Sequence, residues 1–235
     1  MRRAGWGKIP PHMSPPATEA GFTGFALVLL AGGQSARFGG PKLIAPLGGK
    51  PLALHAAGML ATLPFATRFA VIGPDVPDLA AFGYQTVPLT PPGAPQARSL
   101  ALGVAAAQAA GARAVLVALA DMPLVPAAHI HALVRQFDGD RIATEAGGVT
   151  MPPAIFGAAH FAALTTLDGD RGGAARLKEA PTVPLDPRLA LDVDHPEDLA
   201  RAQALLYPPF VTPAKAGAQS GKHGIGRSGF PPSRE

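Results

Sequence analysis

The spacing of apolar positions alternates between two patterns along the chain. Continuous apolar runs of strand length occupy 25–30, 69–72 and 114–118, and a further strand is expected over 84–87. Between and after these runs, apolar residues recur every three or four positions, as on a helix with one buried face. These helical stretches are 51–61, 97–110, 126–137 and 196–206, and 141–193 predicts short strands with one or two helices.

Residues at the element ends support this pattern. Gly111 is placed to end the helix 97–110, and Pro196 is placed at the first position of the last helix. Strands that alternate with helices predict an α/β fold, with a mainly parallel sheet covered by helices on both faces. Ligands of such sheets bind beyond the carboxyl ends of the strands, so we expect the chemistry after Leu30 and Ala118.

The two ends of the chain differ from its middle. Residues 1–23 and 208–235 are rich in Gly and Pro and lack periodicity, which predicts a flexible extension and a disordered tail. Met13 is an alternative start to Met1. The net charge is +4 for the whole chain but −1 for 24–207. Since a nucleic-acid-binding domain usually carries its positive patch on the folded part, we expect no nucleic-acid partner.

The composition excludes several classes of function. The chain has no cysteine, which excludes disulfides, cysteine–zinc sites and thiol catalysis. No apolar run is long enough to cross a bilayer, and no secretory signal follows the basic residues at the start. We therefore expect a cytoplasmic protein without a membrane partner.

The first candidate site is the loop 30–42, which reads LAGGQSARFGGPK. Its glycines let backbone amides approach a ligand closely and turn toward phosphate. Arg37 and Lys42 add two cations, which suits a triphosphate whose leaving pyrophosphate gathers negative charge. The loop matches neither the Walker P-loop nor the dinucleotide-binding glycine pattern.

Carboxylates follow the later elements. Asp121 comes directly after the strand 114–118 and is placed to hold Mg²⁺, which prefers oxygen ligands. Asp192 and Asp194 are expected to point in opposite directions. At most one of them would then face a metal unless the chain bends, and the other would be structural, near the last helix. Ser99 lies in the first turn of the helix 97–110, where capping is favoured over contact with a base.

Four segments together resemble the molybdenum cofactor nucleotidylyltransferases, which have a MobA-like NTP transferase domain. They are 30–42, 99–103 (SLALG), 121–123 (DMP) and 192–198 (DVDHPED). The resemblance covers about residues 25–206. It implies a Rossmann-like three-layer αβα sandwich of the nucleotide-diphospho-sugar-transferase type. It also implies a Mg²⁺-dependent transfer of a nucleoside monophosphate from an NTP to a molybdopterin-type acceptor.

The resemblance also implies the roles of single residues. The catalytic residues would be Lys42, Arg37 and Asp121. The metal ligands would be Asp121 and Asp192, and the acceptor would be bound by Asp170, Gly172 and Asp192. The nucleotide-binding set would be Leu30, Ala31, Gly32, Gly33, Gln34, Ser35, Arg37, Lys42, Ser99 and Asp121.

The choice of nucleotide rests on details of these segments. The short spacing from Arg37 to Lys42, the segment 99–103 and the Gly-Asp segment 169–173 resemble the cytidylyl-transferring branch. Gly33 is more similar to the guanylyl-transferring branch, and His195 replaces a usual Thr. CTP is therefore favoured, with GTP as the alternative.

Other functions stay open at this point. The acceptor could be another phosphorylated metabolite, or the domain could be a degenerate module that binds nucleotide or delivers a cofactor. A molybdoenzyme or its chaperone is then a candidate partner. The presence of Arg37, Lys42 and Asp121 together argues against a degenerate domain.

Overall fold

A computed structural model describes residues 21–33, 35, 37–167 and 173–208 of the chain. A seven-stranded sheet with strand order β5-β4-β1-β6-β8-β7-β9 forms its centre. Its strands are β1 (Phe25–Ala31), β4 (Thr67–Ile72), β5 (Gln85–Pro88), β6 (Ala114–Leu119), β7 (Arg141–Ala146), β8 (Val149–Gly157) and β9 (Thr182–Pro184). Only β8 among them runs antiparallel to its neighbours, so the prediction of a mainly parallel sheet is confirmed.

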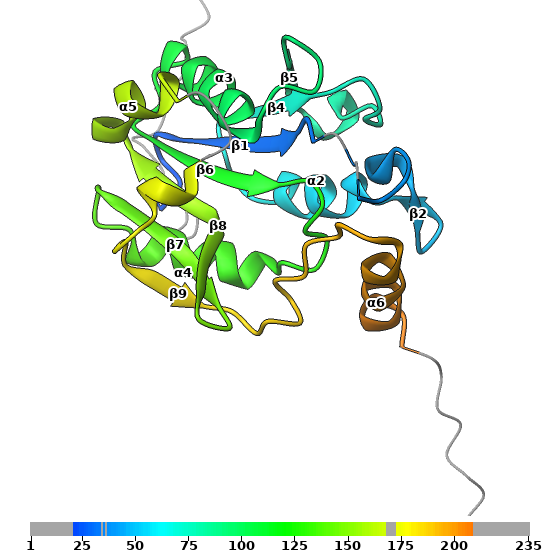
Figure 1. The fold of residues 1–235 in the computed structure, drawn as a ribbon. Helices are drawn as coiled ribbons and strands as arrows, with labels where there is room; N and C mark the ends of the chain where they lie inside the picture. The colour runs from blue at the N-terminus through cyan, green and yellow to red at the C-terminus, as the bar shows by residue number, and fades with distance from the viewer. Residues whose placement is uncertain (1–20, 34, 36, 168–172, 209–235) are drawn as a thin grey trace, which may run out of the picture.

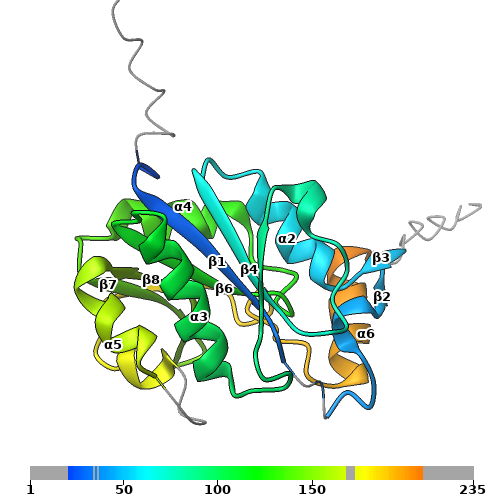
Figure 2. The same cartoon turned by 90° about the horizontal axis from the view of Figure 1, so that it is seen from above.

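Helices cover both faces of this sheet. Figures 1 and 2 show α3 (Gln96–Ala109) and α5 (Phe161–Thr165) on one face, and α2 (Ala53–Ala61) and α4 (Ala127–Gln136) on the other. Short 3-10 turns lie at Lys42–Ile44, Ala80–Phe82, Ala158–His160 and Gly173–Arg176. The arrangement is the three-layer αβα sandwich expected from the sequence.

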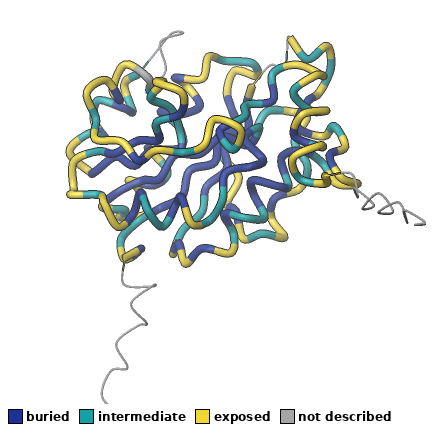
Figure 3. Tube along the Cα trace, turned by 90° about the horizontal axis from the view of Figure 1, so that it is seen from below, coloured by how far each residue is buried: buried dark blue, intermediate teal, exposed yellow. Residues whose placement is uncertain are grey.

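The two central strands form the most buried part of the chain. Every residue of β6 and all of β1 after Phe25 are buried, as the dark tube in Figure 3 shows. Continuous apolar runs are typical of parallel strands covered on both faces. The main core therefore fixes the carboxyl ends of these two strands side by side, in the register Leu30↔Leu119.

A smaller unit lies beside the sheet. The hairpin β2 (Pro46–Leu47) and β3 (Lys50–Pro51) packs against α6 (Pro196–Leu206) (Figure 1). Its backbone is tied to α6 where Gly48 N donates to Gln203 Oε1 at 2.7 Å. A second apolar cluster joins this unit to the site segments and contains Leu47, Leu52, Leu124, Val193 and Ala202.

Two of the differences from the predicted boundaries have a clear structural cause. The helix predicted from residue 51 begins at Ala53, because Pro51 pairs with Pro46 in the hairpin. Phe22, which the prediction placed in the flexible extension, is buried and makes an edge-to-face ring contact with Phe65. Phe22 therefore belongs to the packed core of the described chain. None of the helices in the described part of the chain has the length and apolar character needed to span a membrane.

Candidate active site

The glycine-rich loop leaves β1 at the carboxyl edge of the sheet. A side chain at Gly32 would collide with the Leu89 side chain and would lie 3.0 Å from Ser99 Oγ, so the backbone needs glycine here. A side chain at Gly33 would meet nothing within 4 Å, which means that Gly33 faces open space. The backbone thus approaches α3 closely at one residue and stays accessible at the next.

The loop then folds back on itself. Ser35 adopts a positive φ of 51°, which is uncommon for a residue other than glycine. Its carbonyl accepts a hydrogen bond from Phe38 N at 3.0 Å, and its Oγ accepts one from Lys42 N at 3.4 Å. These bonds return the chain to the strand edge and leave only 7% of the Lys42 side chain exposed.

Asp121 and the segment before α6 are joined by their backbones. Val193 N donates to the Asp121 carbonyl at 3.0 Å, while the Val193 side chain is fully buried. Asp198 in the first turn of α6 accepts from Asp194 N at 3.3 Å and from His195 N at 3.0 Å, which caps the helix. The acidic segment is therefore held at both ends.

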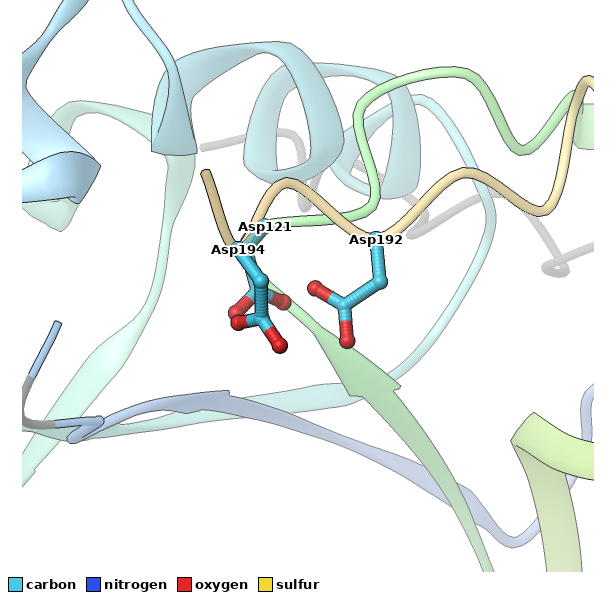
Figure 4. A group of neighbouring side chains, drawn as sticks. All are labelled: Asp121, Asp192 and Asp194. Carbon is cyan, nitrogen blue, oxygen red and sulfur yellow. The ribbon is translucent and has the colours of Figure 1, made fainter. Parts of the chain in front are cut away.

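Three carboxylates converge as a result. Oxygens of Asp121, Asp192 and Asp194 lie within 4.8 Å of one another, and Figure 4 shows all three side chains directed to the same region. The prediction that Asp192 and Asp194 point apart is wrong. Residues two apart on an extended chain share a side, and the buried Val193 takes the opposite one.

Lys42 compensates part of this negative charge. Its Nζ lies 2.7 Å from Asp121 Oδ2 and 2.8 Å from Asp194 Oδ1. Burial would lower the pKa of Lys42, but its interactions with Asp121 and Asp194 outweigh burial and raise the pKa. The ammonium therefore stays charged between the two carboxylates. Arg37 lies farther out, 72% exposed, with its Nη1 3.1 Å from Asp194 Oδ2.

Two carboxylate oxygens have no such partner. Oδ1 of Asp121 and Oδ1 of Asp192 are buried and accept no hydrogen bond from any residue that the structure describes. Burial and the nearby Asp121 charge raise the pKa of Asp192 to about 7. Buried acceptors without donors are costly, so this pair fits a group that would bring positive charge, such as a divalent cation.

A cavity of about 560 Å³ opens above these residues. It extends from the acidic cluster along the glycine-rich loop to the start of α3, and it is lined by Leu30, Gly32, Gly33, Ser35, Arg37, Lys42, Gly93, Ala94, Pro95, Gln96, Ser99, Leu119, Asp121, Asp192 and Asp194. A second cavity of about 540 Å³ shares the loop and extends to Gly73 and Asp75. The volumes are in the range of small-molecule sites.

The structure brings most of the predicted residues together. Ala31 borders the second cavity, and the other predicted residues of the described loop border the first. Ser99 was expected to cap its helix, but the helix starts at Gln96 and has no side-chain cap, so that prediction is wrong. Ser99 is buried and borders the first cavity instead. Gln34, Asp170 and Gly172 lie outside the described residues.

The ion pairs of Asp194 were missed from the sequence. The alternation of Asp192, Val193 and Asp194 contained the signal for the shared direction of the two carboxylates, because an apolar residue between them places both on one side, but it did not identify their partners. The segment 93–96, which forms the far wall of the cavity, has no polar motif that would mark it.

Comparison with known proteins gives the family. The model of the MobA-like NTP transferase domain matches residues 27–183. A molybdenum cofactor guanylyltransferase of Cereibacter sphaeroides is 34% identical over 186 residues, which cover 76% of this chain and 95% of the relative. The chain belongs to the MobA-like NTP transferase family.

Solved structures share the fold. The homologue of Mycobacterium tuberculosis Rv0371c from Mycobacterium sp. strain JC1 has a TM-score of 0.66 and 25% identity, covering 78% of this chain and 96% of its own. The molybdopterin-guanine dinucleotide biosynthesis protein A of Archaeoglobus fulgidus has a TM-score of 0.58 and 18% identity, covering 77% and 98%. Family membership implies an NTP and a molybdopterin as substrates.

Proposed function

We propose that this chain transfers CMP from CTP to the phosphate of a molybdopterin-type acceptor and releases pyrophosphate. The observation that carries the proposal is the convergence of Lys42, Asp121 and Asp192 on a cavity bordered by the glycine-rich loop. An oxygen of the acceptor phosphate attacks the α-phosphorus and forms a new P–O bond there. The bond from the α-phosphorus to the bridging oxygen breaks, and pyrophosphate leaves with the electron pair. The reaction needs no nucleophilic side chain.

The proposed work of the protein is alignment and charge neutralisation. Lys42 is buried, charged and fixed, so its attraction for the growing charge on pyrophosphate is screened little by water. Arg37 is mostly exposed and would contact the outer phosphates. The loop backbone at Gly32 and Gly33, together with Ser99, would contact the nucleoside.

Asp121 and Asp192 are the proposed ligands of Mg²⁺. The two residues fit this ion, because each has a buried oxygen without a hydrogen-bond donor. A bound Mg²⁺ supplies further neutralisation of the phosphate oxygens. Asp192 must release its proton for that role. In the metal-free protein burial and the Asp121 charge raise its pKa to about 7, so proton and metal would compete for this side chain.

The acceptor would lie on the Asp192 side of the site. By the resemblance to the family, Asp170 and Gly172 would contribute to its binding. We also propose that the catalytic unit is the domain that begins before Phe22 and ends near residue 207, and that the protein acts in the cytoplasm.

The proposed preference for CTP rests on the short loop between Arg37 and Lys42 and on Ser99. Ser99 is buried beside Gly32 and borders the cavity, so its hydroxyl is available to distinguish one base edge from another. An unmatched buried polar group costs about 1–3 kcal/mol, which is enough for such a choice. GTP is the second candidate, because the relative from Cereibacter sphaeroides carries the name of a guanylyltransferase.

The test is pyrophosphate release with each of four NTPs, with Mg²⁺ and reduced molybdopterin–molybdate as acceptor. We expect turnover with CTP at a kcat/KM at least tenfold above that with GTP. A preference for GTP would overturn the cytidylyl assignment and leave nucleotidyl transfer intact. Absence of turnover with any NTP would overturn the proposed reaction with this acceptor.

A further inference from the structure

The three carboxylates of the site differ in what they contact. Asp121 and Asp192 each keep a buried oxygen that has no hydrogen-bond partner in the described part of the chain. Asp194 keeps none, because one of its oxygens contacts Lys42 Nζ at 2.8 Å and the other contacts Arg37 Nη1 at 3.1 Å. Among the described residues of the site, Asp194 is thus the carboxylate that joins both cations of the loop.

The backbone holds Asp194 in this orientation. The buried Val193 precedes Asp194 in the chain. The backbone N–H of Asp194 donates to the side chain of Asp198, in the first turn of α6. Arg37 and Lys42 precede Asp194 by 157 and 152 positions, so the contact is purely tertiary. A carboxylate between two cations reduces their mutual repulsion and fixes their separation.

We infer that Asp194 is a positioning residue, which holds Lys42 and Arg37 for the phosphates while Asp121 and Asp192 are open to a metal ion. A buried ammonium needs a compensating charge, and Lys42 has two in the described structure. A metal ion on Asp121 would compete with Lys42 for that carboxylate. Asp194 would then be the partner that keeps the lysine in place.

This inference rests on the proposed function, but its test has readouts other than turnover. The first readout is Mn²⁺ binding, measured by electron paramagnetic resonance as a probe for the divalent cation. We expect the Mn²⁺ affinity of Asp194→Asn to stay within threefold of the wild-type value. The affinity of Asp121→Asn should fall at least tenfold. A tenfold loss in Asp194→Asn would make Asp194 a metal ligand and overturn the inference.

The second readout is a double-mutant cycle with Lys42→Met, in which the binding of magnesium pyrophosphate is measured by calorimetry. We expect Asp194→Asn to weaken binding at least threefold when Lys42 is present and to weaken it less when Lys42 is absent, since only the contact with Arg37 is then lost. Equal effects in both backgrounds would indicate a general structural role. Tighter binding would make Asp194 a competitor of the phosphates. Either result overturns the inference.

Two further variants serve as controls in case a substitution of a buried residue unfolds the protein. Arg37 is exposed, so the same cycle with Arg37→Met does not remove a buried group. Asp186→Asn breaks an exposed arginine pair of the same type away from the cavity and should leave all readouts unchanged. If the unchanged protein turns over no NTP, the proposed function fails, yet the two binding readouts still decide the role of Asp194.

In turnover, Asp194→Asn should lower kcat about 10–100-fold and change the KM for the nucleotide little. The reason is that misplaced groups cost most at the transition state. An unchanged kcat would contradict the positioning role.

Discussion

Two groups of buried polar side chains in this molecule differ in how completely their hydrogen bonds are formed. In the first, His129 Nε2 donates to Thr144 Oγ1 at 2.8 Å, and Thr144 Oγ1 donates to the Pro153 carbonyl at 2.8 Å. In the second, Lys42 joins Asp121 and Asp194, but Asp121 and Asp192 keep unpartnered oxygens. The hydrogen bonds of the first group connect its members to one another, whereas the second group keeps acceptors without a donor among the described residues.

We interpret the first group as structural and the second as part of the proposed site. A closed chain of bonds joins α4 to β7 and β8 and leaves nothing to bind. An incomplete one costs free energy in the ligand-free protein, and a ligand of opposite charge recovers that cost. The comparison predicts that changes in the second group alter turnover and binding, whereas changes in the first alter stability alone.

The largest effect is expected for Asp121→Asn. The change keeps the shape but removes a charge that we assign to the metal and to Lys42, so turnover should fall by about 10³-fold or more. The melting temperature should stay within a few degrees of the original. Asp140→Asn, which removes the charge of an exposed aspartate paired with His160, is the control. Near-normal turnover of Asp121→Asn at saturating Mg²⁺ would place Asp121 among the structural residues.

Lys42→Ala should lower kcat by about 10²–10³-fold, with a smaller effect on nucleotide affinity, because a fixed cation matters most where charge develops. Steady-state kinetics with the preferred NTP provide the measurement. Lys50→Ala removes an exposed lysine of the neighbouring hairpin and should have no such effect. A raised KM with an unchanged kcat would indicate uniform binding instead.

The sequence predicts this site only in part, for physical reasons. Strand β1, the glycine loop and Asp121 follow from local patterns, since a buried run ending in glycines or a carboxylate marks the edge of a parallel sheet. The pairing of Asp194 with Arg37 depends on how α6 packs, which no local pattern contains. Ser99 was assigned as a cap because only its position in the first turn is visible in the sequence.

The fold shows the same division. Strands β1, β4, β5 and β6 and helices α2, α3, α4 and α6 were predicted with boundaries off by one or two residues, whereas for 141–193 only short strands and one or two helices were predicted. The antiparallel direction of β8 was not predicted, because apolar periodicity does not indicate the direction in which a strand runs. Phe22 was missed since a lone aromatic residue in a Gly-rich segment gives no period.

The third prediction concerns the N-terminal boundary. It tests whether Phe22 contributes to stability. Deleting residues 1–20 should leave both stability and turnover unchanged. Deleting 1–23 also removes Phe22, which is buried against Phe65, and should lower the free energy of unfolding by about 3 kcal/mol. Chemical denaturation of both variants measures the difference. Equal stabilities would show that the Phe22 contact contributes nothing.

Thr144→Val should lower the free energy of unfolding by about 1–3 kcal/mol, because it leaves the buried His129 and the Pro153 carbonyl without their partner. The kcat of the folded protein should not change. Thr166→Val is the matched control, because Thr166 is exposed and its hydroxyl donates to the Ala162 carbonyl. A large loss of kcat at unchanged stability would remove the distinction between the two polar groups.

The smallest effect is a pH dependence of about tenfold in metal affinity. The pKa of Asp192 is raised to about 7, so this side chain is mostly protonated at pH 6 and mostly charged at pH 8. Mn²⁺ should therefore bind about tenfold more weakly at pH 6 than at pH 8. Burial lowers the pKa of His129, so that side chain stays mostly neutral over most of this range.

The raised pKa of Asp192 also determines how the free energy of unfolding changes with pH. The pKa of Asp192 is higher in the folded chain than its ordinary value of 3.8, so the unfolded chain releases this proton first. The contribution of Asp192 to the stability of the metal-free protein is complete below pH 3.8 and is lost as the pH rises through about 7. Asp192→Asn should remove both this slope and the pH dependence of Mn²⁺ binding. A slope that persists in Asp192→Asn would assign the proton to another group of the cluster.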